Sequence, residues 1–212
     1  MMKWLKVAMI TLCFAFAAGA AQAQTQEVVE APDKLIERLS AELLDLLKTD
    51  QQLRAGDTDR IIAIVNGKVL PHLNFRRMTA MAVGPKWREA TTEQKDSIEK
   101  EFQMMLIRTY SGALDQVSQD VKIVLLPYRA APEDTDVMVR TEIRMASNPN
   151  PIELSYRLRL ETTGWMVYNV NVAGVWMVEN YRSQFLPILN SNGLDGLIKA
   201  LHERGDGELN QK

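Results

Sequence analysis

The spacing of apolar residues changes from helical to strand periodicity just past the middle of the chain. Before that point apolar side chains recur every three to four residues, as in Leu35, Leu39 and Leu43, and this spacing predicts amphipathic helices. After it they alternate with polar residues, as they do over residues 137–145, which is the pattern of half-buried strands. Residues 175–204 return to helical spacing. Helices, then a sheet, then helices predict an α+β domain.

Six helices are expected from the apolar spacing and the helix-boundary signals. The fourth begins with a capping box, because Thr91 is followed three residues later by Gln94. Pro187 should bend or shorten the fifth, because proline lacks the amide proton that an inner turn requires. The expected segments are one between Pro32 and the break at residues 55–57, one between that break and Pro71, and then about residues 74–83, 91–117, 175–189 and 194–204.

About four strands are expected between the fourth and fifth helices. The links Asn148-Pro149-Asn150-Pro151 and Thr162-Thr163-Gly164 have turn chemistry, and such short links join antiparallel strands. One face of each strand is apolar and the other is charged, which suits a curved antiparallel sheet wrapped by the N- and C-terminal helices. The expected strands are residues 121–125, 137–145, 152–160 and 166–172. In the last of these, the expected inner face consists of Met166, Tyr168, Val170 and Val172.

The start of the chain has the three parts of a secretory signal peptide. Lys3 and Lys6 are followed by the uncharged apolar run 7–20 and by the small-residue cleavage site Ala21-Gln22-Ala23. A membrane anchor is the alternative, but an apolar run of about 14 residues is shorter than the roughly 20 that a spanning helix needs. We therefore expect a signal peptide at 1–23, a flexible segment at 24–32, a single domain at 33–204 and a flexible tail at 205–212.

Cys13, the single cysteine, lies in the expected signal peptide. Its removal would leave a mature chain that can form no disulfide, zinc–thiolate site or thiol nucleophile, so that burial alone stabilises the fold. The formal net charge of the whole chain is −2, and loss of Lys3 and Lys6 makes it more negative. A mildly acidic chain without a basic block is not expected to bind nucleic acid.

Catalytic and metal-binding patterns are absent from the sequence. The two histidines, His72 and His202, are both expected at the surface, and no G-x-S-x-G, H-E-x-x-H, P-loop or G-x-G-x-x-G pattern occurs. Acidic residues such as Glu93 and Asp96 lie on expected solvent faces of helices. We therefore expect no catalytic residue, no metal site and no enzyme. The alternative is an exported enzyme of isomerase or hydrolase type on a curved sheet, for which the available inward groups are Tyr110, Tyr156, Tyr168 and Thr141.

Methionine and tyrosine are frequent on the expected inner faces. The simpler interpretation is an ordinary packed core, and periodicity alone does not distinguish a filled core from a hollow one. Methionine nevertheless suits surfaces that repack around variable apolar ligands, and tyrosine suits a partly wet cavity. The inward residues are Met78, Met81, Met105, Met145, Met166, Met177, Tyr110, Tyr156, Tyr168, Tyr181 and Phe185.

Short motifs spread over nearly the whole mature chain occur in one specific order and spacing. They are Phe75-Arg76-Arg77-Met78-Thr79, Val83-Gly84-Pro85-Lys86-Trp87-Arg88, Ala90-Thr91-Thr92-Glu93-Gln94, Phe102, Thr109-Tyr110-Ser111, Val139-Arg140-Thr141, Pro151-Ile152, Tyr156-Arg157-Leu158, Gly164-Trp165, Tyr168, Val170, Gly174-Val175, Asn180-Tyr181-Arg182-Ser183-Gln184-Phe185 and Gly193-Leu194-Asp195-Gly196-Leu197-Ile198. Together they resemble the MlaC family, also called the toluene-tolerance family, which is the periplasmic phospholipid-binding component of the Mla lipid-transport system.

The resemblance implies a soluble carrier in the periplasm that shuttles phospholipid between two membrane complexes. One is an outer-membrane lipoprotein–porin complex, and the other is an inner-membrane ABC transporter complex with its periplasmic lipid-binding subunit. Such transport would contribute to the lipid asymmetry of the outer membrane. The resemblance also implies no catalysis and no cofactor, with phospholipid as cargo in an apolar pocket between the sheet and the helices. We expect the carrier to act as a monomer.

Residues that combine an inward periodicity with a place in the matched motifs are expected to line this pocket. They are Phe75, Met78, Met105, Tyr110, Val139, Tyr156, Tyr168, Val170, Val175 and Tyr181. Arg76, Arg77 and Arg182 are candidates for the lipid phosphate, because a guanidinium matches phosphate geometry. The alternative for these three arginines is a role in surface salt bridges or in docking to partner proteins.

Overall fold

The computed structural model describes residues 29–112, 114 and 118–207. Within these residues, no helix combines the length and the apolar character that crossing a membrane would need. The expected parts that lie outside them are the signal peptide at 1–23, residues 24–28 of the N-terminal segment and residues 208–212 of the tail.

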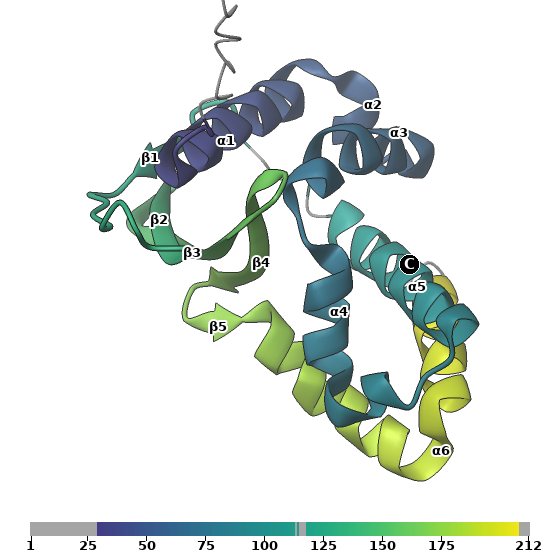
Figure 1. The fold of residues 1–212 in the computed structure, drawn as a ribbon. Coiled ribbons are helices and arrows are strands. Elements are labelled where there is room, and N and C mark those ends of the chain that lie inside the picture. The colour runs from purple at the N-terminus through teal and green to yellow at the C-terminus, as the bar shows by residue number, and fades with distance from the viewer. Residues whose placement is uncertain (1–28, 113, 115–117, 208–212) are drawn as a thin grey trace, which may run out of the picture.

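Along the chain, helices precede and follow a single sheet. Figure 1 shows α4, α5 and α6 gathered beside this sheet, with α1 lying across the strands. In chain order the elements are α1 (Pro32–Thr49), α2 (Gln51–Arg54), α3 (Thr58–Ile64), the π-helix η1 (Val65–Val69), the 3-10 helix η2 (Leu70–His72), α4 (Phe75–Val83), the 3-10 helix η3 (Gly84–Arg88), α5 (Thr92–Ser111), β1 (Lys122–Leu125), β2 (Asp136–Met145), β3 (Asn148–Glu161), β4 (Gly164–Val172), β5 (Val175–Trp176) and α6 (Met177–Gly207).

Side-chain caps determine where several helices begin. Asp50, Asp57 and Asn74 each accept a hydrogen bond from the backbone amide three residues later, at the starts of α2, α3 and α4. The expected capping box is present at α5, where Thr91 and Gln94 each bond the backbone amide of the other. These caps satisfy amide protons that the first helical turn leaves without a partner.

The five strands form one antiparallel meander in the order β1-β2-β3-β4-β5. The expected α+β class is therefore confirmed, with one short strand, β5, beyond the four expected. The turn between β2 and β3 lies at residues 146–147, so the predicted turn at residues 148–151 is wrong, and those residues begin β3. Pro149 and Pro151 are tolerated because they fall in an irregular stretch of the pairing with β2, where their missing amide protons break no regular ladder.

Strand β4 carries a one-residue bulge at Tyr168, which changes the facing of its first half. Leu158 of β3 pairs with Val167 and the preceding β3 residue pairs with Asn169, so Tyr168 is the extra residue. Val167 therefore packs in the same apolar cluster as Leu158, and Met166 falls in the opposite phase. The alternation that predicts Met166 on the inner face is wrong, because the period of two does not continue through a bulge.

The helical region before α4 and the end of α5 also differ from expectation. The α-helix expected between the break at residues 55–57 and Pro71 ends at Ile64, and the chain continues as the π-helix η1. At the end of η1 the Leu70 amide donates a hydrogen bond to the Val65 carbonyl. Helix α5 ends at Ser111 rather than near residue 117. Both changes shorten α-helices that the apolar spacing alone would extend.

The closing helical region is divided at Gly193. Its φ of 66° and ψ of −163° lie outside the helical range, so α6 consists of two helical parts, as expected, and Pro187 lies within the first. The first part begins at Met177 rather than at Val175, because the two preceding residues pair with β4 as strand β5. The second part continues as far as Gly207, three residues beyond the expected domain end.

Three apolar clusters join these elements. One lies between α1 and the sheet and includes Leu35, Val139 and Leu158. Another joins α4, α5 and α6 around the fully buried Phe185. The third connects α2 and α3 to α5 and includes Ile107. The sheet therefore meets α4, α5 and α6 at β4 and β5, and the core of these three helices is a separate cluster from the core under α1.

Candidate functional site

An apolar pocket of about 500 Å³ lies between α4, α5 and α6 and the last two strands. This volume is within the range of roughly 300–1,000 Å³ that is usual for small-molecule sites. Five of the residues predicted to line a pocket do line this one, and each comes from a different element. They are Met78, Tyr110, Val170, Val175 and Tyr181.

Six further residues complete the described lining, and five of them are apolar. Phe102 and Leu106 are four residues apart on α5, so helical periodicity places them on one face but does not separate a pocket from a core. Asn180 carries no such signal in the sequence. The six are Phe102, Leu106, Val172, Met177, Val178 and Asn180.

Aromatic packing holds one wall of the pocket. The ring centroid of Phe102 lies 4.9 Å from that of Tyr181 and 5.2 Å from that of Phe185, in both cases edge to face. It lies 5.5 Å from the centroid of Phe75, and those two rings are stacked. Pairs at these distances add stability beyond simple burial. This wall is therefore part of the helical core.

Three apolar residues of the lining also reach the surface. The exposed fraction is 47% for Tyr110, 40% for Val172 and 51% for Val175. The hydroxyl of Tyr110 lies 3.4 Å from the hydroxyl of Tyr181. Exposed apolar side chains around a pocket are typical of ligand sites, because a chain of CH₂ groups can enter past them without meeting a charged barrier.

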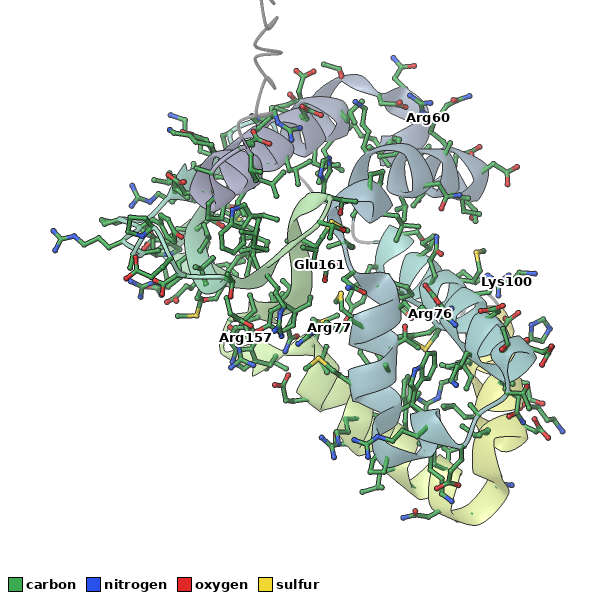
Figure 2. The ribbon with its side chains drawn as sticks, in the orientation of Figure 1. Arg60, Arg76, Arg77, Lys100, Arg157 and Glu161 are labelled. Carbon is green, nitrogen blue, oxygen red and sulfur yellow. The ribbon has the colours of Figure 1, made fainter. Side chains whose placement is uncertain are left out.

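Charged groups surround Tyr168 where α4 meets β4. The Tyr168 hydroxyl donates to Asp136 at 2.8 Å, and the guanidinium carbon of Arg77 lies 4.8 Å from the centroid of the Tyr168 ring. Figure 2 shows Arg77 and Arg157 near this junction. Burial, and then the hydrogen bond to Asp136, raise the pKa of Tyr168, so its hydroxyl stays protonated. The Nε of Arg77 is buried and has no hydrogen-bond partner among the described residues.

The other two candidate arginines are exposed. Arg76 forms ion pairs with Asp96 at 2.8 Å and Glu99 at 3.0 Å, both on α5. Arg182 lies against Gly84, where a Cβ atom would be 3.5 Å from its Nε. Neither arginine is among the lining residues of the 500 Å³ pocket, and Arg77 is not among them either.

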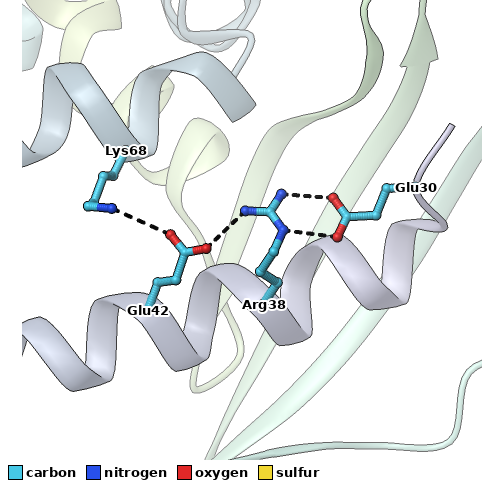
Figure 3. Close-up of polar contacts among 4 residues, drawn as sticks. All are labelled: Glu30, Arg38, Glu42 and Lys68. Carbon is cyan, nitrogen blue, oxygen red and sulfur yellow. Dashed lines mark hydrogen bonds and ion pairs between the residues drawn. The ribbon is translucent and has the colours of Figure 1, made fainter. Parts of the chain in front are cut away.

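A network of ion pairs ties the start of α1 to η1 (Figure 3). Arg38 donates to both carboxylate oxygens of Glu30, at 2.7 Å and 3.0 Å, and to Glu42 at 3.2 Å. Lys68 lies 3.6 Å from the same Glu42. The hydrogen bond from Arg38 lowers the pKa of Glu30. Because all four side chains are substantially exposed, each of these ion pairs contributes little to the stability of the fold.

A cleft of mixed polarity, about 420 Å³ in volume, lies beside this network. Glu30, His72, Thr162 and Trp165 are among its lining residues. Burial lowers the pKa of His72, which favours the neutral imidazole. Within the described part of the chain, no group of three or more His, Cys, Asp or Glu side chains is arranged to bind a metal ion.

The family model described as MlaC protein matches residues 37–203 of the chain. The chain belongs to the MlaC family. A curated relative, the intermembrane phospholipid transport system binding protein MlaC of Haemophilus influenzae, is 24% identical over 203 residues, which are 95% of this chain and 92% of the relative. A solved structure, the phospholipid-binding protein of Ralstonia solanacearum in complex with a phospholipid, is 36% identical. It has a TM-score of 0.76 and covers 82% of this chain and 96% of that chain.

The resemblance to the MlaC family that the motifs indicate is thereby confirmed. The relative from Haemophilus influenzae is named as a binding protein of a transport system. The expectation that this MlaC-family chain is not an enzyme agrees with that name. Its α+β fold, with an antiparallel sheet flanked by helices, is also the fold of the phospholipid-binding protein from Ralstonia solanacearum.

The remaining predicted lining residues of this MlaC-family chain lie elsewhere. Phe75 lines a second apolar pocket, described below, together with Tyr110. Met105 is buried in the cluster of α4, α5 and α6. Val139 and Tyr156 pack between α1 and the sheet, and burial raises the pKa of Tyr156. These residues and Tyr168 stay predictions as lipid contacts, because periodicity marks a residue as inward without showing whether a pocket or packed side chains lie opposite it.

Proposed function

We propose that this chain binds phospholipid and carries it across the periplasm. The observation that supports this most is the 500 Å³ apolar pocket with an exposed apolar rim, in a chain of the MlaC family. A relative with 36% identity is a phospholipid-binding protein solved with a phospholipid. The pocket would take the acyl chains, and the headgroup would stay near solvent.

The energetics of the task favour such a pocket. Exposing acyl chains to water costs about 0.8 kcal/mol per CH₂, so two chains of about 15 methylenes cost roughly 24 kcal/mol. A carrier must therefore cover most of that length. The pocket lining offers few polar groups that would hold the cargo tightly, and this suits a protein that must release it again.

The three candidate arginines keep two possible roles in the proposal, phosphate binding and docking. Arg182 follows the pocket residue Tyr181 and is exposed, which suits contact with a headgroup. Arg76 is engaged by two carboxylates, which suits a surface or docking role better. Arg77 precedes the pocket residue Met78, but its guanidinium lies over the Tyr168 ring.

The proposed transport runs between the two membranes of the cell. The signal-like start of the sequence supports a periplasmic location, and the relative's name refers to intermembrane phospholipid transport. We infer that a monomeric carrier exchanges lipid with an outer-membrane lipoprotein–porin complex and with an inner-membrane ABC transporter complex and its periplasmic lipid-binding subunit. Such exchange would maintain lipid asymmetry of the outer membrane.

The alternative of an isomerase or hydrolase gains no support from the geometry. Its best candidate groups are hydroxyls, and the hydroxyl oxygens of Thr141 and Tyr156 lie 3.5 Å apart within the packing between α1 and the sheet. A raised pKa makes Tyr156 a weaker acid, and neither residue lines the apolar pocket. No nucleophile–base pair is formed by the residues that line it.

A matched pair of charge substitutions tests the proposal. Val175 and Leu186 are exposed by 51% and 55%, so the fold should tolerate glutamate at either position. Val175→Glu places a charge beside the acyl chains, whereas Leu186 is not among the pocket residues. Phospholipid that copurifies with each protein is extracted and measured by mass spectrometry. Val175→Glu should retain several-fold less lipid than the wild type, and Leu186→Glu should retain as much. Equal lipid in a folded Val175→Glu protein would overturn the pocket assignment.

A further inference from the structure

A second apolar pocket, of about 270 Å³, lies beside the first along α5. It is lined by α3, η1, η2, α4 and α5, and Val65, Leu73 and Phe75 are among its residues. Its described lining is apolar apart from Gln103, Ser111 and the hydroxyl of Tyr110.

The two pockets share a wall. Leu106 and Tyr110 line both of them, and these residues are one helical turn apart on α5, so their side chains form one ridge. Tyr110 is the part of this ridge that reaches the solvent, because its side chain is about half exposed. We define Leu106 and Tyr110 as the dividing ridge. The pockets are therefore neighbours and not separate features of the surface.

Helix α4 contributes to both pockets in the same way. Phe75 lines the second pocket and Met78 lines the first, and residues three apart lie on one face of a helix. One face of α4 therefore contributes to the lining of both pockets. A two-chained molecule could lie along it with one chain on each side of the dividing ridge.

The wall of the second pocket opposite α5 contains an irregular helix. Val65 begins the π-helix η1, a geometry that is rare and is often found at functional sites. The side-chain amide of Gln103 on α5 donates to Asn66 of η1 at 3.0 Å, which holds the two walls at this separation. A regular α-helix here would place Val65 and Leu70 differently around the pocket.

We propose that the second pocket receives one acyl chain of a diacyl phospholipid while the first receives the other, with the dividing ridge between them. This inference rests on the proposed function and adds that the two chains are held apart. Each chain is then surrounded by apolar side chains, and the glycerol backbone lies over the exposed edge of Tyr110. A single-chain lysophospholipid needs only one of the two pockets.

Photocrosslinking tests this arrangement directly. A benzoylphenylalanine is introduced in place of Val65 in the second pocket, of Val172 in the first, or of the exposed Leu186 as a control. Each protein is loaded from vesicles of a diacyl phospholipid, irradiated and analysed by mass spectrometry. Lipid adducts at positions 65 and 172, and none at 186, are the expected result. Adducts at 172 alone would overturn the two-pocket inference, whereas adducts at neither position would instead contradict phospholipid binding itself.

A pocket-filling variant gives an independent readout. Val65→Trp fills the second pocket, and Val65→Ala is its matched control. After circular dichroism shows that both proteins are folded, each is loaded with diacyl phospholipid or with lysophospholipid. Val65→Trp should bind diacyl phospholipid several-fold more weakly than Val65→Ala and bind lysophospholipid equally well. Equal binding of diacyl phospholipid by the two variants would contradict the inference.

Discussion

The hydroxyl oxygen of Tyr110 on α5 lies 3.4 Å from the hydroxyl oxygen of Tyr181 on α6, across the apolar pocket. Tyr181 is buried in the helical core, whereas Tyr110 is almost half exposed. The contact therefore connects the buried aromatic wall of the first pocket to a half-exposed residue that also lines the second pocket. At Tyr110, the role of the hydroxyl in the contact with Tyr181 and the role of the ring in the dividing ridge can therefore be tested by separate substitutions.

Tyr110→Phe removes this contact and keeps the dividing ridge. Because the contact is long and partly exposed, its loss should lower the free energy of unfolding by less than about 1 kcal/mol. Urea unfolding measures that change, and lipid extraction should find as much phospholipid as in the wild type. Tyr110→Ala also removes the ring, which is the exposed part of the dividing ridge, so it should bind a phospholipid with a bulky pyrene-labelled chain several-fold more tightly than Tyr110→Phe does. Equal affinities would show that the ring does not divide the space.

Phe185→Ala should destabilise the fold strongly. The Phe185 ring is fully buried at the centre of the helical cluster, and its removal leaves a cavity beside Phe102. The expected loss is about 3–5 kcal/mol in the free energy of unfolding. Leu186→Ala, at the next position but exposed, should change it by less than about 0.5 kcal/mol. A small effect of Phe185→Ala would mean that this cluster does not support the pocket wall.

Gly84→Ala and Gly67→Ala should have opposite effects on stability. Gly84 ends α4 with φ 73° and ψ −143°, a backbone conformation that residues with a Cβ rarely adopt, so alanine should cost about 1–3 kcal/mol. Gly67 lies in η1 with nothing within 4 Å of an added Cβ, so alanine should stabilise by about 0.4–1 kcal/mol. Thermal unfolding of the two variants distinguishes these signs. Destabilisation by Gly67→Ala would show that η1 needs glycine for its π-helical geometry.

His72 should make the fold less stable as the pH falls below its ordinary pKa of 6.5. Burial is the main cause of the lowered pKa in the folded state; Arg38 opposes protonation too, while Glu30 and Glu42 favour it. The unfolded chain therefore binds a proton at a higher pH than the folded chain, and stability is lost from pH 6.5 down to the folded pKa and then levels off. Urea unfolding of His72→Gln between about pH 5 and 7.5 should show a weaker pH dependence than the wild type. An identical slope would contradict this.

Local signals predicted most of the fold. The capping box at Thr91 and Gln94 is present, and the alternation in β2 places Val137, Val139 and Thr141 inside as expected. Such signals depend only on residues close in the sequence, and the predicted elements form because tertiary packing favours the same local structure. The MlaC resemblance depends in the same way on residues that the sequence displays directly.

Features that depend on pairing or on helix geometry were not predictable in this way. The bulge at Tyr168 moves Met166 out of phase, and it arises from the register with β3 rather than from a residue preference. The change from α-helix to π-helix at Val65 does not alter the apolar spacing of the sequence, so periodicity predicts one continuous α-helix there. Whether Phe102 lines a pocket or fills a core depends on which side chains other segments place opposite it, and the sequence around Phe102 does not determine this.

Native mass spectrometry of the purified wild-type protein tests the central claim most directly. The full-length chain is expressed with residues 1–23 in place, and the resulting protein is purified without added lipid and measured under conditions that preserve noncovalent complexes. The account predicts a species heavier than the chain by the mass of a phospholipid, which organic extraction removes and incubation with phospholipid vesicles restores. A protein that carries no phospholipid when isolated, and acquires none from vesicles while folded, would contradict it.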